Sequence, residues 1–227
     1  INLETQLLNT IYFTEDDVGF QIMTTPENKI NVKNIIEKYN LENIVITIVN
    51  FDSKNISQFL FSEEFYQNVC LFKVFIYQLD SLLLKKLDKK YYKYDWIGAP
   101  WAEINLKQYN LHDKMIPVGN GGFNIRNISL CRKIADKFNY NIKEACEIFN
   151  SDDTDDHIYQ RLLNAEDIVY SYHLQTDTNI DANIPETNIA KCFSVEDPIY
   201  LNTEIIAFHN TYTYFNHYKS IDLFENI

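Results

Sequence analysis

Basic residues and long apolar runs are scarce in this 227-residue sequence, and each absence excludes a class of protein. Acidic residues outnumber basic ones by 32 to 20, which gives a formal net charge of −12. This negative field would repel a nucleic-acid backbone or an anionic membrane surface, so we expect neither as the main partner. No run approaches the roughly 18 apolar residues of a membrane span, so we expect no membrane span in this chain.

Cysteine is also sparse, and its spacing excludes the usual cysteine-based sites. The four cysteines, Cys70, Cys131, Cys146 and Cys192, include no C-x-x-C pair. Neither a zinc knuckle nor a dense disulfide framework is therefore indicated, and we expect free, reduced thiols. The N-terminus lacks the charged and apolar blocks of a signal peptide. We accordingly expect a cytoplasmic location, in a bacterium or in a virus-infected host cell.

Glycine and proline are few, with five of each, and no stretch rich in them divides the chain. We therefore expect one domain over residues 1–227. The sequence begins at Ile1 rather than Met. We expect it to be part of a longer chain, with the first strand of the fold lying upstream.

Apolar periodicity predicts strands and helices in alternation. Helical spacing is found at residues 2–13, 30–39 and 128–138, and a helix start at Ser62. Strand-like runs are found at residues 19–24, 43–49, 70–76, 94–101 and 205–211. Residues 43–49 give the clearest prediction of a buried strand. This order predicts an α/β fold, Rossmann-like, with a mostly parallel central sheet flanked by helices.

Asp80 is the first candidate for a functional residue, because it directly follows the apolar run 70–76 and a short polar turn. Strands of open α/β sheets deliver their last side chains to the edge where nucleotide ligands bind. An acidic residue there can hold a divalent cation against a diphosphate. The alternative is an ordinary helix N-cap, because residues 81–84 resemble the start of a helix.

Three of the five glycines lie together in the segment Val118-Gly-Asn-Gly-Gly-Phe-Asn-Ile-Arg126. Such a concentration lets backbone amides approach a ligand closely, although a bulge or tight turn would use it equally well. The preceding segment, residues 102–117, has no clear pattern. Long loops of this kind are often lids or binding loops, and we expect this one to help select an acceptor.

Two further candidates lie in the second half of the chain. The acidic run that contains Asp155 and Asp156 precedes helical spacing, so it either caps a helix or supplies a general base. His209 ends a strand-like run, as Asp80 nearly does. It is either a hydrogen-bonded structural residue or a metal ligand. Imidazole and carboxylate together, with phosphate oxygens in the open positions, would suit Mn²⁺.

Three blocks of this sequence resemble a known family. They are Phe75-Ile-Tyr-Gln-Leu-Asp-Ser81, Tyr94-Asp-Trp-Ile-Gly-Ala-Pro-Trp101 and the glycine-rich segment, and Phe208-His-Asn210 extends the resemblance towards the C-terminus. Together they are similar to a glycosyltransferase-like, DUF5672-like family of unknown function found in bacteria and large DNA viruses. The resemblance extends to nucleotide-sugar transferases of the GT-A type.

The resemblance implies a single GT-A-like domain and a role for each matching residue. Asp80 matches the last acid of the metal-binding D-x-D motif, whose first acid is replaced by Gln78. His209 matches the histidine that completes the metal site for Mn²⁺ or Mg²⁺. The resemblance further implies a catalytic pair and two sets of binding residues. These are Asp155 and Asp156 for catalysis, Gln78, Asp80, Ser81, Gly121, Gly122 and Phe123 for the donor, and Trp101, Asn120 and Arg126 for the acceptor.

The implied activity is transfer of a sugar from a nucleoside diphosphate sugar, with UDP-sugars favoured over GDP-sugars, to a glycan or protein hydroxyl. A divalent cation would neutralise the leaving diphosphate without a basic pocket, which fits an acidic protein. Two alternatives remain. One is a catalytically degenerate sugar- or nucleotide-binding relative, which the glutamine at position 78 motivates. The other is a nucleotidyltransferase or a metal-dependent hydrolase. The sequence contains no phosphate-binding G-x-x-x-x-G-K-[ST] motif.

Overall fold

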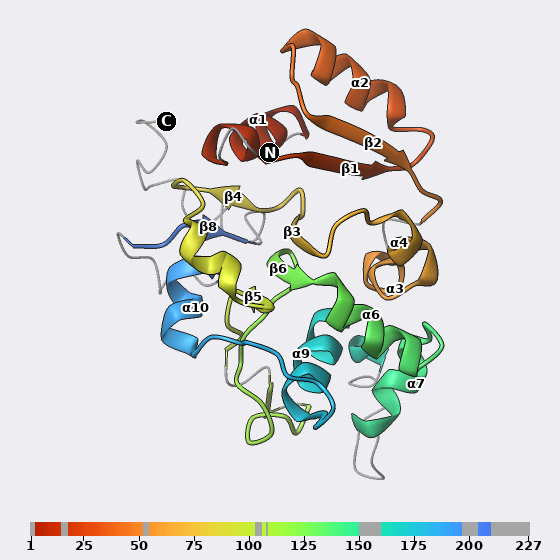
Figure 1. The fold of residues 1–227 in the computed structure, drawn as a ribbon, viewed down its shortest axis with the longest axis vertical. Coiled ribbons are helices and arrows are strands. Elements are labelled where there is room, and N and C mark those ends of the chain that lie inside the picture. The colour runs from red at the N-terminus through yellow and green to blue at the C-terminus, as the bar shows by residue number, and fades with distance from the viewer. Residues whose placement is uncertain are drawn as a thin grey trace.

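The computed structural model describes residues 3–14, 18–51, 55–102, 106–107, 109–149, 160–196 and 204–209. In these residues helices and small sheets alternate, which gives a mixed α/β fold (Figure 1). The helices are α1 (Leu3–Phe13), α2 (Lys29–Lys38), α3 (Ile56–Leu60), α4 (Glu63–Asn68), α6 (Ile128–Lys137), α7 (Ile142–Cys146), α9 (Glu166–Thr176) and α10 (Thr187–Phe193), with short 3-10 turns η2 (Lys89–Lys93) and η3 (Glu147–Phe149). The strands are β1 (Phe20–Thr24), β2 (Ile44–Ile48), β3 (Lys73–Tyr77), β4 (Leu82–Leu83), β5 (Trp96–Gly98), β6 (Phe123–Asn127), β7 (Ser194–Val195) and β8 (Ala207–Phe208).

The described strands form three small sheets, and the mostly parallel central sheet predicted from the sequence is not found among them. Strands β1 and β2 are parallel, but β6 runs antiparallel to both β3 and β5 in the order β3-β6-β5. The third sheet, β4-β8-β7, combines one antiparallel and one parallel pairing. The apolar runs located β1, β2, β3, β5 and β8, but they did not predict β4, β6 or β7 and carry no information on the direction in which β6 runs after the glycine-rich segment.

Most of the predicted elements in the first half of the chain are confirmed. Helices α1 and α2 and strands β1 and β2 agree with the predicted ranges to within about two residues. Ser62 caps α4, because its hydroxyl oxygen accepts a hydrogen bond from the backbone N–H of Phe65. The predicted burial of β2 is wrong: Val45 keeps 60% of its surface exposed, and no residue of this strand is fully buried.

The segment after Asp80 is a strand and not a helix, which removes helix capping as the explanation for this aspartate. Residues Leu82 and Leu83 form β4, which pairs with β8. Helix α1 lies against β4 in Figure 1, and the side chain of Asn9 exchanges two hydrogen bonds with the backbone of Leu83. The amide of Gln6 reaches the carbonyl of Ser81 at 3.4 Å. Side chains of α1 thus fix the turn that presents Asp80.

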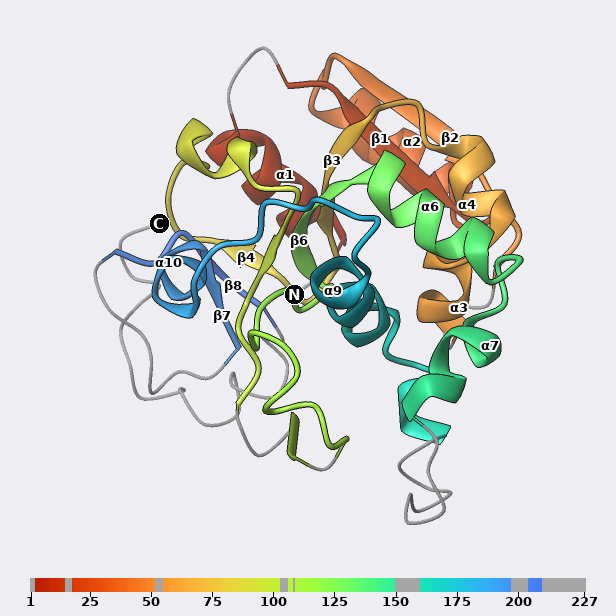
Figure 2. The ribbon, with the colours of Figure 1, turned by 60° about the horizontal axis from the view of Figure 1, so that its bottom comes forward.

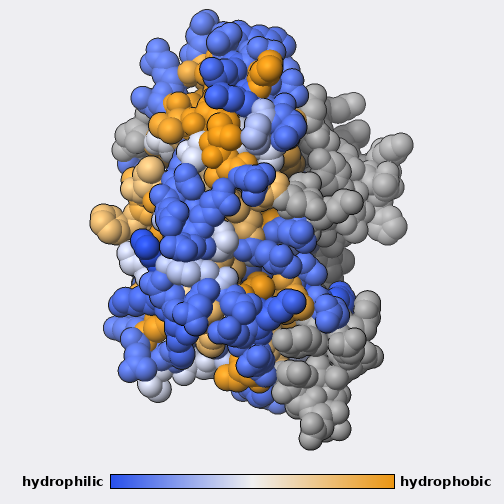
Figure 3. Space-filling view, turned by 90° about the vertical axis from the view of Figure 1, so that its right-hand side faces the viewer, coloured by the Kyte–Doolittle hydropathy of each residue, from blue (hydrophilic) through white to orange (hydrophobic). Residues whose placement is uncertain are grey.

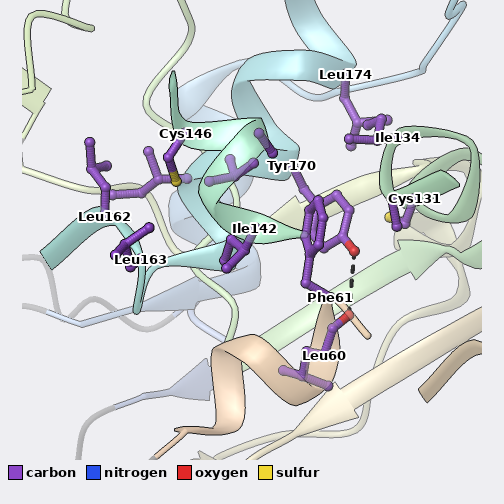
Figure 4. Close-up of a cluster of buried hydrophobic side chains, with 14 of the residues drawn as sticks. Leu60, Phe61, Cys131, Ile134, Ile142, Cys146, Leu162, Leu163, Tyr170 and Leu174 are labelled. Carbon is purple, nitrogen blue, oxygen red and sulfur yellow. Dashed lines mark hydrogen bonds between the residues drawn. The ribbon is translucent and has the colours of Figure 1, made fainter. Parts of the chain in front are cut away.

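The largest hydrophobic cluster lies between the helices α3 and α4 and the helices α6, α7 and α9 (Figures 2 and 4). Phe61 is fully buried and stacks on Tyr170, with ring centroids 5.0 Å apart. The hydroxyl of Tyr170 donates to the carbonyl of Leu60, as the dashed line in Figure 4 marks. Residues 106–115, within the loop expected to select an acceptor, contribute Leu106, Tyr109, Leu111 and Met115 to the same core. This part of the loop is therefore anchored to the core.

The surface mixes polar and apolar residues. Figure 3 shows separate hydrophobic areas between hydrophilic ones on the face that it draws. In the described part of the chain, Phe72 is the most exposed large hydrophobic residue, at 84%. None of the described helices is both long enough and apolar enough to span a bilayer.

The packing of Phe61 generates a stability prediction. We expect Phe61→Ala to lower the free energy of unfolding by about 3–5 kcal/mol, because it leaves a cavity against Tyr170. Phe72→Ala is the matched control, since the exposed ring loses little packing and should change stability by about 0.5 kcal/mol or less. Urea unfolding followed by fluorescence measures both. Equal effects of the two substitutions would contradict the packing described here.

Candidate functional site

The sheet β4-β8-β7 gathers three titratable side chains at one end. Leu82 of β4 pairs with Phe208 of β8, so Asp80, just before β4, and His209, just after β8, lie at the same end. Val195 of β7 pairs with Phe208, which places Glu196 next to His209. Asp80 and His209, the two residues that the sequence suggests as cation ligands, therefore meet at one end of this sheet.

His209 lies between the carboxylates of Asp80 and Glu196. Its Nε2 is 3.4 Å from Oδ1 of Asp80, and its Nδ1 is 3.0 Å from Oε1 of Glu196. Burial disfavours the imidazolium, but the two carboxylates outweigh this and raise the pKa of His209 to about 9. Burial also favours protonated Asp80, but the neighbouring His209 outweighs it and lowers the pKa of Asp80.

Asp80 Oδ1 and His209 Nε2 could bind a divalent cation if it replaced the second ring proton of His209. Both atoms are buried, and neither makes a well-aligned hydrogen bond to any described residue. Neighbouring ligands of an octahedral cation with bonds near 2.1 Å lie roughly 3 Å apart, close to the separation seen here. Carboxylate and imidazole are also suitable ligand types for Mn²⁺. Among the described residues no group of three or more His, Cys, Asp or Glu side chains could hold a metal, so a cation would need further oxygen ligands from a substrate or water.

The glycine-rich segment packs directly against this pair. A Cβ atom on Gly122 would lie 1.8 Å from Nε2 of His209, so only glycine fits there. The carbonyl of Gly122 accepts hydrogen bonds from the backbone N–H of Gln78, at 2.8 Å, and from the hydroxyl of Ser81, at 3.0 Å. The segment is thus fixed to the turn that carries Asp80.

On the other side of the same segment lies Asp167, in the first turn of α9. The backbone N–H of Gly121 donates to Oδ2 of Asp167 at 2.9 Å. Burial, together with the negative charge of Glu166, raises the pKa of Asp167 to about 7, although the Gly121 hydrogen bond opposes the shift. The side chain is partly buried. Asp167 is therefore a carboxylate suited to proton transfer near neutral pH.

A buried ion pair between Arg126 and Glu166 packs against the glycine-rich segment. Nη2 of Arg126 is 2.7 Å from Oε1 of Glu166, and the two side chains are only 1% and 4% exposed. The guanidinium stacks over the ring of Trp96, and its Nε donates to Oδ1 of Asn124 at 2.8 Å. Burial lowers the pKa of Arg126, but Glu166 outweighs this and raises it, so the arginine stays charged.

Several residues predicted to touch a donor or acceptor have interior side chains. Ser81 and Phe123 are fully buried: Ser81 fastens the glycine-rich segment, and Phe123 begins β6. Trp101, predicted as a sugar-stacking surface, is a core residue with 7% exposure. Arg126, predicted to bind the acceptor, points into the protein because Glu166 and Trp96 hold it there. These four side chains therefore support the site from the protein interior and are not positioned to contact a donor or acceptor.

The remaining predicted residues that the structure describes lie at or near the site. Gln78, Asn120, Gly121 and Gly122 lie in the turn or the glycine-rich segment, next to Asp80 and His209. Asn120 is mostly buried, and its amide contacts Glu196. The predicted catalytic residues at positions 155 and 156 lie outside the described residues.

The sequence did not reveal two carboxylates of this site, Asp167 and Glu196. The Glu166-Asp167 pair at the start of an apolar helix was a visible signal, but acids in a first turn are common for dipole reasons alone. Glu196 had no local signal, since its role depends on a strand pairing that joins distant segments.

Comparison with known proteins gives one match. A family model described as a protein of unknown function, DUF5672, matches residues 38–213. No curated protein and no solved structure matches the chain.

The contact between Gly122 and His209 generates a prediction. We expect Gly122→Ala to displace the His209 ring and to lower the free energy of unfolding by about 1–3 kcal/mol, as overpacking does. Gly19→Ala is the matched control, because the nearest atom to its added Cβ is 4.0 Å away. Urea unfolding and the NMR shifts of the histidine rings measure both effects. An unchanged His209 ring signal in Gly122→Ala would refute the close contact.

Proposed function

The chain belongs to DUF5672, a family of proteins of unknown function, and we propose that it is a metal-dependent glycosyltransferase of the GT-A type. It would move a sugar from a nucleoside diphosphate sugar, with UDP-sugars favoured, to a hydroxyl group of a glycan or protein. The observation that supports this most directly is the pair of buried ligand atoms, Asp80 Oδ1 and His209 Nε2, which lie 3.4 Å apart without a well-aligned hydrogen bond, so that a cation could replace the ring proton between them.

The donor would be held through its diphosphate. The chain carries a formal charge of −12, and the ion pairs described for Asp80 and Glu196 are with His209. A diphosphate at this place therefore needs a cation, for which Asp80 and His209 are the protein ligands. A bound Mn²⁺ or Mg²⁺ would neutralise the charge that develops on the leaving diphosphate.

The transfer step requires a group that accepts the acceptor's proton. The acceptor oxygen forms a bond to the anomeric carbon as the bond from that carbon to the diphosphate oxygen breaks, and the hydroxyl proton must leave. We assign this proton to Asp167, because its pKa of about 7 makes it a stronger base than an ordinary aspartate. Asp167 accepts a hydrogen bond from the backbone of Gly121, and the next residue, Gly122, contacts His209. Asp167 therefore lies close to the proposed cation site. Such a base suits a reaction that inverts the anomeric configuration.

A binding screen tests the donor site. We expect one nucleoside diphosphate sugar to raise the melting temperature in the presence of Mn²⁺ and not with EDTA, because a ligand of the native state stabilises it by mass action. UDP, GDP, CDP and their common sugars are compared by thermal shift and calorimetry. Asp80→Asn should abolish the shift, and Asp88→Asn, at an exposed 3-10 cap, should preserve it.

Two outcomes would contradict the proposal in different ways. A shift that persists with EDTA would exclude the metal, and its persistence in Asp80→Asn would remove Asp80 from the site. Binding without donor turnover by the wild-type protein would support a catalytically degenerate relative, which the glutamine at position 78 also suggests.

The base is tested by substitution and by pH. We expect Asp167→Asn to lower kcat by about 10²–10⁴-fold with little change in donor affinity, as for a lost general base. In the wild type, kcat should fall about tenfold per pH unit below about 7, because protonated Asp167 cannot accept a proton. Donor hydrolysis with water as acceptor provides the assay. Asp181→Asn, at an exposed position, is the control.

The same assay separates the two candidate bases. A loss of kcat in Asp156→Asn that exceeds the loss in Asp167→Asn would transfer the role to the acidic run predicted from the sequence. Equal losses of kcat and donor affinity in Asp167→Asn would assign it to binding or stability.

A further inference from the structure

Glu196 has no part in the proposed chemistry, yet it makes the best-aligned contact to His209. Its Oε1 lies 3.0 Å from Nδ1 of His209 and 2.7 Å from Nδ2 of Asn120. We propose that Glu196, held in place by Asn120, is a positioning residue that orients the His209 ring so that Nε2 faces Asp80. The consequence for cation binding rests on the proposed function, whereas the orientation of the ring does not.

The chemistry of the two partners fixes the proton on the ring. A carboxylate only accepts hydrogen bonds, so the ring nitrogen that faces Glu196 must be the N–H donor. Nδ1 of His209 therefore carries a proton in either charge state of the ring, and Nε2 is the nitrogen that faces Asp80 Oδ1, 3.4 Å away. In the charged ring Nε2 also carries a proton, which faces the Asp80 carboxylate. A cation bound here would replace this second proton and take the Nε2 lone pair and Asp80 Oδ1 as ligands, and Glu196 sets up this arrangement.

The orientation of Asn120 follows from the same reasoning. The backbone N–H of Gly122 donates to Oδ1 of Asn120 at 3.1 Å, and a backbone N–H cannot accept. The amide NH₂ must therefore face Glu196, which receives it. The Asn120 amide and the Nδ1–H of His209 both donate to Oε1 of Glu196. Glu196 is therefore held by the glycine-rich segment as well as by His209. Asn120 is 8% exposed, which keeps competing water away from this contact.

The strands place these groups together. Glu196 follows β7 and His209 follows β8, and the two strands are parallel neighbours in register. The backbone N–H of His209 donates to the carbonyl of Val195 at 3.0 Å, which ties the two residues at the strand ends. Histidine ligands in metal sites usually donate their second ring N–H to a carboxylate in this way, and loss of that partner typically weakens metal binding 10–100-fold.

A measurement on the metal-free protein tests the orientation. In ¹⁵N-histidine-labelled protein we expect one slowly exchanging Nδ1–H signal, assigned to His209 by its absence in His209→Asn. The signal should persist in Glu186→Ala, a control at an exposed helix cap, and should be lost in Glu196→Ala. Glu196→Leu, which fills a similar space but has no acceptor oxygen, serves if the alanine variant fails to fold. Persistence of the Nδ1–H signal without the carboxylate would overturn the proposal, whatever the metal does.

A double-mutant cycle tests the consequence for the cation. The loss of the free Mn²⁺ signal in electron paramagnetic resonance measures binding. We expect Glu196→Ala to weaken Mn²⁺ binding about 10–100-fold in the wild-type background and to have no further effect in His209→Ala, because Glu196 acts through His209. An equal loss in both backgrounds would show that Glu196 acts by its own charge, which would overturn positioning.

The two measurements separate this proposal from the proposed function. If the wild-type protein does not bind Mn²⁺ but the Nδ1–H signal depends on Glu196, the orientation of His209 stands and the metal-dependent transferase is refuted. If Mn²⁺ binds and neither the Nδ1–H signal nor the Mn²⁺ affinity depends on Glu196, the transferase stands and the positioning role is refuted.

Discussion

Close packing against the backbone of Gly121 and Gly122 is the constraint on which the candidate site depends. The carbonyl of Gly122 is fastened to the turn at Gln78 and Ser81, its Cα lies against His209, and the N–H of Gly121 is fastened to Asp167. Each contact uses a backbone group, and a side chain on Gly122 would occupy the place of the imidazole ring. The relative positions of the acids and the histidine are thus set by the path of the main chain.

The buried pair of Arg126 and Glu166 gives this segment a rigid base. Burying two charges costs several kcal/mol per ion in desolvation, which their attraction offsets only when geometry and further hydrogen bonds are good. Here Asn124 supplies such a hydrogen bond, and Trp96 and Tyr170 supply aromatic faces. Because Glu166 and Asp167 are neighbours in α9, a pair that holds one also limits where the other can lie. The negative charge of Glu166 also helps to raise the pKa of Asp167.

The sequence predicted the parts of this site that depend on local pattern. Asp80 was recognisable because an apolar strand and a short turn precede it, and the glycines stood out because the chain has so few. The buried roles of Ser81, Trp101 and Arg126 could not be predicted. The local sequence around a polar or aromatic residue does not show whether its side chain contacts a ligand or a distant part of the same chain. Glu196 and the antiparallel course of β6 depend on pairings between remote segments, on which local periodicity is silent.

The sheet β4-β8-β7 joins distant parts of the chain through strands of only two residues each. Bringing Asp80 to His209 closes a loop of more than half the chain, and the entropy lost must be offset by contacts that form in the folded state. Buried side chains of the sheet, such as Leu83, Val195 and Ala207, belong to hydrophobic clusters and supply such contacts. A ligand bound to both Asp80 and His209 would act as a non-covalent cross-link between the two halves of the polypeptide. Its affinity would include the work of closing that loop.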